Sequence, residues 1–270
     1  MGNLGSDLEP HYLPPRGKPL GTNPTWKVSA GILIPLVKLI SKRDWRGVEN
    51  IPRSGPMIAI SNHISYMDPL ILTYFLYDNG RAVRFLGKAS LFKLPIVGWI
   101  LRQAEQVPVE RELKGASALA LPHAIAFLKA GHCLGVYPEG TLTRDENLWP
   151  MHAKTGLARL AVMTKAPVIP CAQWGAQEIL EPYSKRPKLW PRTKVTVLAG
   201  KPLDFSSWFG KEDDQGAMVE ATQYAMSAIT SLLEEIRGES APLDIFDPHL
   251  SDLPRTGNYK KLKRQNRKRK

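Results

Sequence analysis

Short apolar segments alternate with longer amphipathic segments along the middle of the chain. Six runs rich in β-branched and aromatic residues predict strands, and five segments with a helical apolar period predict helices. The strands are expected at Met57–Ser61, Val83–Gly87, Gln106–Val109, Cys133–Tyr137, Val168–Trp174 and Lys194–Ala199. The helices are expected at Pro69–Asp78, Pro95–Gln103, Ala116–Ala130, Thr155–Thr164 and Gln215–Arg237. This alternation predicts an α/β fold whose central, mostly parallel sheet is flanked by helices on both faces.

A further apolar segment lies nearer the N-terminus, where residues 26–43 predict a single helix. Its apolar run, Val28–Ile40, is shorter than the roughly 20 residues with which a helix crosses a bilayer. Trp26 precedes the run, and Lys42 and Arg43 follow it; such flanks are typical of a helix that lies on the membrane surface. A helix buried against the rest of the fold explains the same pattern, so both interpretations stay open.

Composition divides the chain further. Residues 1–25 carry proline and glycine every few positions and predict a flexible leader, residues 44–240 predict the folded domain, and residues 241–270 predict an extended basic tail. The net charge is +12, yet eight of the basic residues lie within residues 260–270. The tail is therefore expected to attract anionic membrane lipids. Nucleic acid is the rival ligand of such a tail, but no aromatic-rich recognition pattern accompanies it.

The cysteines and the first residues bear on location. Cys133 and Cys171 are the two cysteines of the chain, too few for a disulfide framework and not in a metal-binding spacing, so a reducing compartment is expected. The first 25 residues lack the basic and apolar regions of a signal peptide. We expect a peripheral protein on the cytoplasmic side of a membrane, without a full transmembrane helix.

The strongest chemical signal follows the first strand of the expected domain. The strand MIAIS runs directly into NHISYMDP, which places His63 at the carboxyl end of a strand, where open α/β sheets bind ligands. On a continuous helix His63 and Asp68 would point about 140° apart, so only a turn brings them together. A histidine held by a carboxylate can act as a general base toward a hydroxyl. The alternative is that Asp68 only caps the next helix and His63 only occupies a turn.

Three further blocks follow in order. They are GKASLFKLPIVGWILRQAEQVPVER from Gly87 to Arg111, VYPEGTLTRD around Glu139, and APVIPCAQWG around Pro170. Together with NHISYMD they resemble the four sequence blocks of the glycerolipid acyltransferase family, which includes the lysophosphatidate acyltransferases. The resemblance extends over roughly residues 45–205, and four blocks in the right order are far more specific than one.

The resemblance implies a glycerol-3-phosphate acyltransferase-like fold and a reaction. His63 is then the general base and Asp68 orients it, while an acyl group moves from acyl-CoA or acyl carrier protein to 1-acylglycerol 3-phosphate, forming phosphatidate. Neither a metal nor a cofactor is implied beyond the acyl donor. The expected partners are the acyl donor, a lysophosphatidate-like acceptor and anionic membrane lipids. The residues expected to bind substrates are Asn62, Lys88, Arg111, Glu139, Gly140, Thr141, Arg144 and Pro170.

Glu139 and Leu142 of the third block are unusual residues for a phosphate site. A carboxylate repels phosphate, so Glu139 must instead hold a cation or the backbone in place, and we expect it to support a neighbouring arginine or lysine. The family's block usually continues Gly-Thr-Arg-Ser, whereas here Leu142 occupies the arginine position and Arg144 comes two residues later. Another acceptor, such as glycerol 3-phosphate, a lysophospholipid or a glycolipid, therefore remains an alternative. A non-catalytic protein that binds lipid, or nucleic acid through its tail, is the second alternative.

Overall fold

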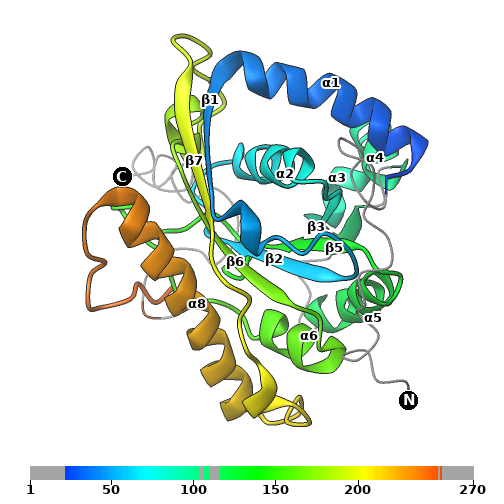
Figure 1. Ribbon diagram of the computed structural model, residues 1–270, viewed down its shortest axis with the longest axis vertical. Coiled ribbons are helices and arrows are strands. Elements are labelled where there is room, and N and C mark those ends of the chain that lie inside the picture. Colours follow the sequence, from blue (N-terminus) through cyan, green and yellow to red (C-terminus); the bar gives the residue numbers. More distant parts are fainter. Residues whose placement is uncertain (1–21, 104–105, 110–115, 249, 251–270) are drawn as a thin grey trace, which may run out of the picture.

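Seven strands form one sheet in the order β1-β7-β6-β2-β5-β3-β4 (Figure 1). The computed structural model describes residues 22–103, 106–109, 116–248 and 250. The strands are β1 (Ser41–Arg46), β2 (Met57–Ser61), β3 (Val83–Lys88), β4 (Val107–Val109), β5 (Cys133–Val136), β6 (Val168–Trp174) and β7 (Thr193–Ala199). Only β6 and β7 pair antiparallel; the other neighbours are parallel. The expected α/β fold with a mostly parallel sheet is confirmed.

Helices cover both faces of this sheet. The α-helices are α1 (Pro24–Ile40), α2 (Asp68–Asp78), α3 (Ala89–Phe92), α4 (Pro95–Gln103), α5 (Ala116–Lys129), α6 (Gly156–Thr164), α7 (Ala176–Ile179) and α8 (Gln215–Arg237). Two short 3₁₀ turns, η1 (Val48–Asn50) and η2 (Ser206–Trp208), lie in the connections. The helices and strands expected from residue 57 onward agree with these bounds to within about a residue at most ends, which is the usual uncertainty of element boundaries.

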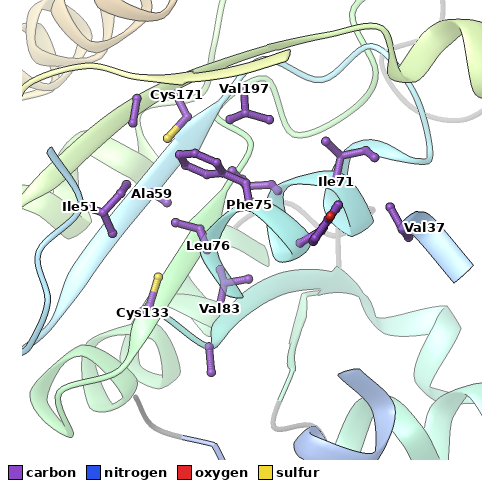
Figure 2. Close-up of a cluster of buried hydrophobic side chains, with 14 of the residues drawn as sticks. Val37, Ile51, Ala59, Ile71, Phe75, Leu76, Val83, Cys133, Cys171 and Val197 are labelled. Atoms are coloured by element: carbon purple, nitrogen blue, oxygen red, sulfur yellow. The ribbon is translucent and has the colours of Figure 1, made fainter. Parts of the chain in front are cut away.

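The two faces of the sheet build two hydrophobic cores. In β2, Met57 and Ala59 belong to the core beneath α1 and α2, whereas Ile58 and Ile60 belong to the core beneath α5, α6 and α8. Figure 2 shows the first core, in which side chains of α2 such as Phe75 pack onto the strands. Because β2 is buried on both faces, its sequence is a continuous apolar run rather than an alternating one.

The expectation of one helix over residues 26–43 was wrong at its C-terminal end. The helix ends at Ile40, and Ser41–Arg46 forms strand β1, paired in register from Ser41↔Thr193 to Arg46↔Leu198. The segment SKRDWR shows no alternation of apolar and polar positions because β1 is an edge strand, where charged side chains are favoured. Its pairing partner lies 152 residues away, so the local pattern does not reveal it.

The direction of β7 determines which loops lie near one another. Since β7 runs antiparallel to β6, with Trp174 opposite Thr196, β7 begins at the edge of the sheet where β6 and β2 end. β1 is parallel to β7 and begins at that same edge. We call this side of the sheet the carboxyl edge. It brings together the end of β2, the C-terminus of α1 and the loop that precedes β7.

Parts of two expected segments fall outside the described residues. These are residues 1–21 of the leader and residues 251–270 of the basic tail, together with residue 249. Arg111 lies outside them as well. Within the described ranges, no helix combines the length and the apolarity needed to span a membrane.

Candidate active site

The site is built where β2 ends and the main chain leaves the sheet. The side chain of Asn62 donates from Nδ2 to the Gln173 carbonyl at 3.0 Å and accepts the Gln173 N–H at Oδ1 at 2.9 Å. Its amide therefore takes the place of a backbone peptide and continues the pairing with β6 by one step. The Gln173 side chain in turn donates to the Asn62 carbonyl at 3.2 Å. These bonds fix the point from which the turn bearing His63 departs.

The turn brings His63 and Asp68 into direct contact. Nδ1 of His63 lies 2.8 Å from Oδ2 of Asp68, and the same oxygen accepts the N–H groups of Ile64 at 2.6 Å and Ser65 at 2.7 Å. The carboxylate thus points back into the turn, while the Met67 carbonyl receives the first amides of α2. Asp68 does more than cap a helix, because it organises the whole turn around the histidine.

The surroundings of the pair favour one tautomer of the imidazole. Asp68 is fully buried, whereas His63 retains 9% of its accessible surface. Burial raises the pKa of the Asp68 carboxyl, and its contacts with His63 and with the amides of the turn oppose that rise. With Oδ2 as acceptor, Nδ1 of His63 carries the proton, so Nε2 is left with a free lone pair. This is the arrangement of a general base.

Glu139 fixes the turn from the other side. Its carboxyl accepts the N–H of His63 at 3.1 Å and the N–H of Met151 at 3.3 Å. Thr143 reinforces the arrangement by donating its N–H to the His63 carbonyl at 2.7 Å. Complete burial raises the pKa of Glu139 to about 8. Glu139 therefore holds the backbone in place, through the amide groups of His63 and Met151, whereas the role expected of it was to support an arginine or lysine.

An aromatic ring supports the imidazole itself. Tyr137, directly after β5, stacks on His63 with ring centroids 4.2 Å apart and planes inclined by 23°. Phe85 of β3 stacks in turn on Tyr137, with the two ring centroids 5.8 Å apart. The hydroxyl of Tyr137 accepts from Nε2 of Gln173 at 3.4 Å. The imidazole is therefore fixed in plane by Asp68 and in tilt by Tyr137.

The residues expected to bind the acceptor differ in burial and in position. Gly140 adopts a left-handed conformation (φ 70°) in the turn after β5, with Lys154 packed against it, and Thr141 follows half-buried. Arg144 is 1% exposed, so it is part of the interior rather than a surface charge. Lys88 is the last residue of β3, at the carboxyl edge. Arg111 lies outside the described residues, and its role stays a prediction.

Of two further expected site residues, Asn62 directly follows β2 and Pro170 lies within β6. Asn62 is fully buried and its amide is engaged by Gln173, so a role in substrate binding stays a prediction. Pro170 pairs with Ile60 of β2 and is set back from the end of β6 at Trp174. Leu142, which replaces the expected arginine, is buried, and its carbonyl accepts the Tyr183 hydroxyl at 3.3 Å.

Two supporting residues of the site, Tyr137 and Gln173, were not predicted from the sequence. Both lie at the carboxyl ends of the strands that flank β2, namely β5 and β6. The signal that would find them is the strand order, because residues at the ends of neighbouring strands converge on the histidine. Strand order is a long-range property, so the motif blocks alone do not reveal this convergence.

Fold and site define an α/β protein that carries a carboxylate-held histidine at the carboxyl edge of a mostly parallel sheet. Residues 42–174, just under half of the chain, match the Acyltransferase family model. The matched segment runs from β1 to the end of β6 and includes both His63 and Asp68.

The chain is also similar in sequence and structure to individual acyltransferases. The chain is 31% identical over 163 residues to the chloroplastic 1-acyl-sn-glycerol-3-phosphate acyltransferase BAT2 of Brassica napus, covering 60% of this chain and 45% of that protein. It is 27% identical to the 1-acyl-sn-glycerol-3-phosphate acyltransferase of Bacillus subtilis, covering 70% and 88%. The crystal structure of the 1-acyl-sn-glycerophosphate acyltransferase PlsC of Thermotoga maritima superposes with a TM-score of 0.60 at 27% identity, covering 80% and 83%. The chain spans less than half the length of the plant relatives it matches.

Proposed function

We propose that this protein transfers an acyl group from a thioester donor, acyl-CoA or acyl carrier protein, to the free hydroxyl of 1-acylglycerol 3-phosphate, forming phosphatidate. The observation that carries the proposal is the 2.8 Å contact between Nδ1 of His63 and Oδ2 of Asp68 at the end of β2. The names of the relatives support the same acceptor, since the Brassica, Bacillus and Thermotoga proteins are all 1-acylglycerol-3-phosphate acyltransferases.

The proton path follows from the tautomer. Nε2 of His63 accepts the proton of the acceptor hydroxyl while the hydroxyl oxygen attacks the thioester carbon. Asp68 stabilises the imidazolium that forms, and the tilt set by Tyr137 keeps Nε2 aimed at the hydroxyl. When the tetrahedral intermediate collapses, the carbon–sulfur bond breaks and the imidazolium returns the proton to the thiolate. No covalent acyl-enzyme is required.

The acceptor phosphate requires cationic side chains and hydrogen-bond donors near the site. Lys88 and the turn at Gly140 and Thr141 lie at the carboxyl edge, and Arg111 and Arg144 complete the expected set of phosphate ligands. A guanidinium can bind phosphate through two parallel hydrogen bonds, and a lysine supplies a point charge. Arg144 is buried beside the turn, so its positive charge can stabilise that turn.

Helix α1 supports a peripheral location on a membrane. Trp26, Ala30, Ile34 and Val37 form a buried stripe, and Trp26 stacks on Tyr77 of α2 at 5.4 Å. The opposite side of the helix carries a second apolar stripe that faces outward: Val28, Ile32, Leu33, Leu36 and Leu39. The two interpretations of the segment thus describe opposite faces of one helix. We propose that the outer stripe of α1 lies in the membrane interface, where the acylated acceptor is found.

Thiol release from palmitoyl-CoA tests the reaction. The native chain is assayed with 1-acylglycerol 3-phosphate and, separately, with glycerol 3-phosphate, a lysophospholipid and no acceptor. Release that depends on 1-acylglycerol 3-phosphate is expected, and His63→Ala should lose at least about a thousandfold in rate, as expected when a general base and its orientation are both removed.

A matched control separates loss of chemistry from loss of fold. His123 lies exposed on α5, on the opposite face of the sheet from α2, so His123→Ala should retain native activity. If release depends on another acceptor instead, the proposed substrate is wrong but the proposed mechanism still stands. Acceptor-independent release, or release unchanged by His63→Ala, would overturn the proposed mechanism.

A further inference from the structure

The chain between α7 and β7 forms an exposed loop with an unusual surface. Its last eight residues, 185–192, have the sequence KRPKLWPR, and all eight are exposed. Trp190 keeps 79% of its accessible surface and Leu189 keeps 54%, although large apolar side chains are usually covered. Residues 181–192 contain four basic residues and a single acidic one, Glu181. The loop thus displays apolar side chains within a cationic frame.

The base of the loop is tied to the active-site turn. The Leu180 carbonyl accepts the Ser65 hydroxyl at 2.7 Å. The start of the loop is therefore bonded to a residue only three positions before Asp68. Tyr183 is buried, donates its hydroxyl to the Leu142 carbonyl at 3.3 Å, and contacts Tyr66 edge to face. The base is therefore fixed on the site, while the segment that follows it is left uncovered.

The end of the loop is tied to α1. The guanidinium of Arg192 donates to the Ser41 carbonyl, at 2.7 Å from Nη2 and 3.2 Å from Nε, directly after the last residue of α1. The view in Figure 1 places α1 along the top of the molecule, with the loop before β7 beside its C-terminal end. The C-terminal end of α1 and the end of the loop therefore lie side by side at the carboxyl edge, where β2 ends before His63.

We propose that residues 185–192 form a second membrane contact, in which Leu189 and Trp190 enter the interface and Lys185, Arg186 and Lys188 bind anionic lipid headgroups. This inference rests on the proposed function, because it assumes that the substrate is presented by a membrane. The loop would orient the protein so that the carboxyl edge faces the lipid surface. It also gives the protein a preference for anionic membranes, which an apolar stripe alone does not provide.

The chemistry of the loop favours lipid over an acidic protein such as acyl carrier protein. Tryptophan concentrates at membrane interfaces because its ring is apolar and its indole N–H is polar. Lysine and arginine beside it reach phosphate groups while their stems stay in apolar surroundings. The outer stripe of α1 offers further exposed apolar side chains, and Arg192 joins the end of the loop to the end of that helix.

Vesicle sedimentation of the full chain tests the proposal. Binding to vesicles of phosphatidylcholine alone is compared with binding to vesicles that also contain phosphatidylglycerol. The charge variant Lys185→Ala/Arg186→Ala/Lys188→Ala should lose about tenfold or more in affinity for the anionic vesicles and little for the neutral ones, and the loss should shrink at high salt. The apolar variant Leu189→Ser/Trp190→Ser should weaken binding to both kinds of vesicle.

The matched control removes the same charge from the opposite edge of the sheet. Lys129, Lys165 and Lys201 are exposed and lie beside β5, β6 and β7 at their far ends, so their triple alanine variant should bind anionic vesicles like the native chain. Equal losses in the control and the loop variants would overturn the proposal. So would loop variants that bind vesicles normally, including the case in which they lose only affinity for acyl carrier protein.

Activity on a water-soluble substrate separates this inference from the proposed function. With a short-chain 1-acylglycerol 3-phosphate that forms no aggregates, the loop variants should retain turnover, whereas His63→Ala should lose turnover and keep vesicle binding. Absence of turnover in the native chain would contradict the reaction without touching the vesicle result. Normal turnover with unchanged vesicle binding in the loop variants would contradict only the docking loop.

Discussion

The turn at residues 62–68 and the loop at residues 180–192 lie at the same edge of the sheet but are built in opposite ways. In the turn, the carboxylate of Asp68 receives two backbone N–H groups besides the imidazole, and Glu139 holds the His63 amide from behind. In the loop, hydrogen bonds fix the two ends, at Leu180 and Arg192, and the apolar tip between them is exposed.

The difference separates two physical demands. A general base works only when its lone pair is aimed within a narrow range, so the imidazole of His63 is held by the Asp68 carboxylate and by the stacked ring of Tyr137. A surface that meets fluid lipid gains from exposed apolar and cationic side chains instead, since lipid supplies the missing contacts. Variants in the turn should therefore change the rate of the chemical step, and variants of the surface should change where the protein works.

The largest effect is expected from Asp68→Asn. Oδ1 of Asp68 has no hydrogen-bond partner among the described residues, so an asparagine must either bury its NH₂ group there or turn it toward three donors. Either orientation loses the charge that stabilises the imidazolium, and the second also reverses the tautomer of His63. We expect the rate constant for acyl transfer to fall by about 10²- to 10⁴-fold.

Steady-state kinetics with 1-acylglycerol 3-phosphate check this, with circular dichroism to establish that the variant folds. The loss should appear in kcat far more than in KM, because the carboxylate does not face the substrate. A folded Asp68→Asn variant with native kcat would show that the pair is structural and would remove the distinction between the two regions.

A smaller effect is expected from the outer stripe of α1. Ile32 and Leu36 are 60% and 55% exposed, so Ile32→Ser/Leu36→Ser should leave the free energy of unfolding almost unchanged. Affinity for vesicles should fall about tenfold or more, since a fully buried Ile or Leu side chain contributes roughly 1.5–3 kcal/mol.

Met163 and Val219 offer the control for this pair. Both are apolar and partly exposed on the helices α6 and α8, on the face of the sheet opposite α2. Met163→Ser/Val219→Ser should bind vesicles like the native chain. If both double variants lose affinity equally, the stripe on α1 has no special role in docking.

The smallest effect concerns pH and Glu139. Its pKa is raised from 4.5 in the unfolded chain to about 8 in the fold, so the folded state binds more protons between these values. The stability contributed by the protonated group is complete below pH 4.5 and is lost as the pH rises through 8. The native melting temperature should therefore fall by several degrees more between about pH 5 and about pH 9 than that of Glu139→Gln, which has no ionisable group there.

Thermal unfolding followed by circular dichroism at a series of pH values measures this difference. The informative quantity is the slope, because Glu139→Gln also weakens the contact with the Met151 amide at every pH. Parallel curves for the two proteins would mean that the Glu139 carboxyl is not held protonated in the fold.

Much of the fold was predictable because burial on both sides leaves a strong pattern. Strands such as Met57–Ser61 and Val168–Trp174 are buried and mostly apolar, and both were located correctly at both ends. β1 was not predicted, because an edge strand with four charged residues in six carries no such pattern. The expected contact of His63 with Asp68 is present in the structure. It was predictable because the two residues are five positions apart and a single turn brings them together.

The supporting part of the site depended on contacts that no local pattern encodes. Asn62 meets Gln173 across 111 residues, and Glu139 meets the His63 amide across 76. A buried amide or carboxyl in a motif block resembles a substrate ligand as long as only the sequence is considered. The three-dimensional structure shows which of these groups have their hydrogen bonds satisfied by the protein itself.

The pairing of β1 with β7 also sets an order of events during synthesis. α1 and β1 are made early, but the edge to which β1 pairs becomes available only after Thr193–Ala199 has been translated. Contacts this distant in sequence form late and slowly. The Arg192 guanidinium, which ties the loop to the end of α1, reaches Ser41 only at that stage. A nascent chain thus has an apolar helix long before it has the loop that we propose as a second membrane contact, so the proposed orientation on a membrane would be a property of the finished fold.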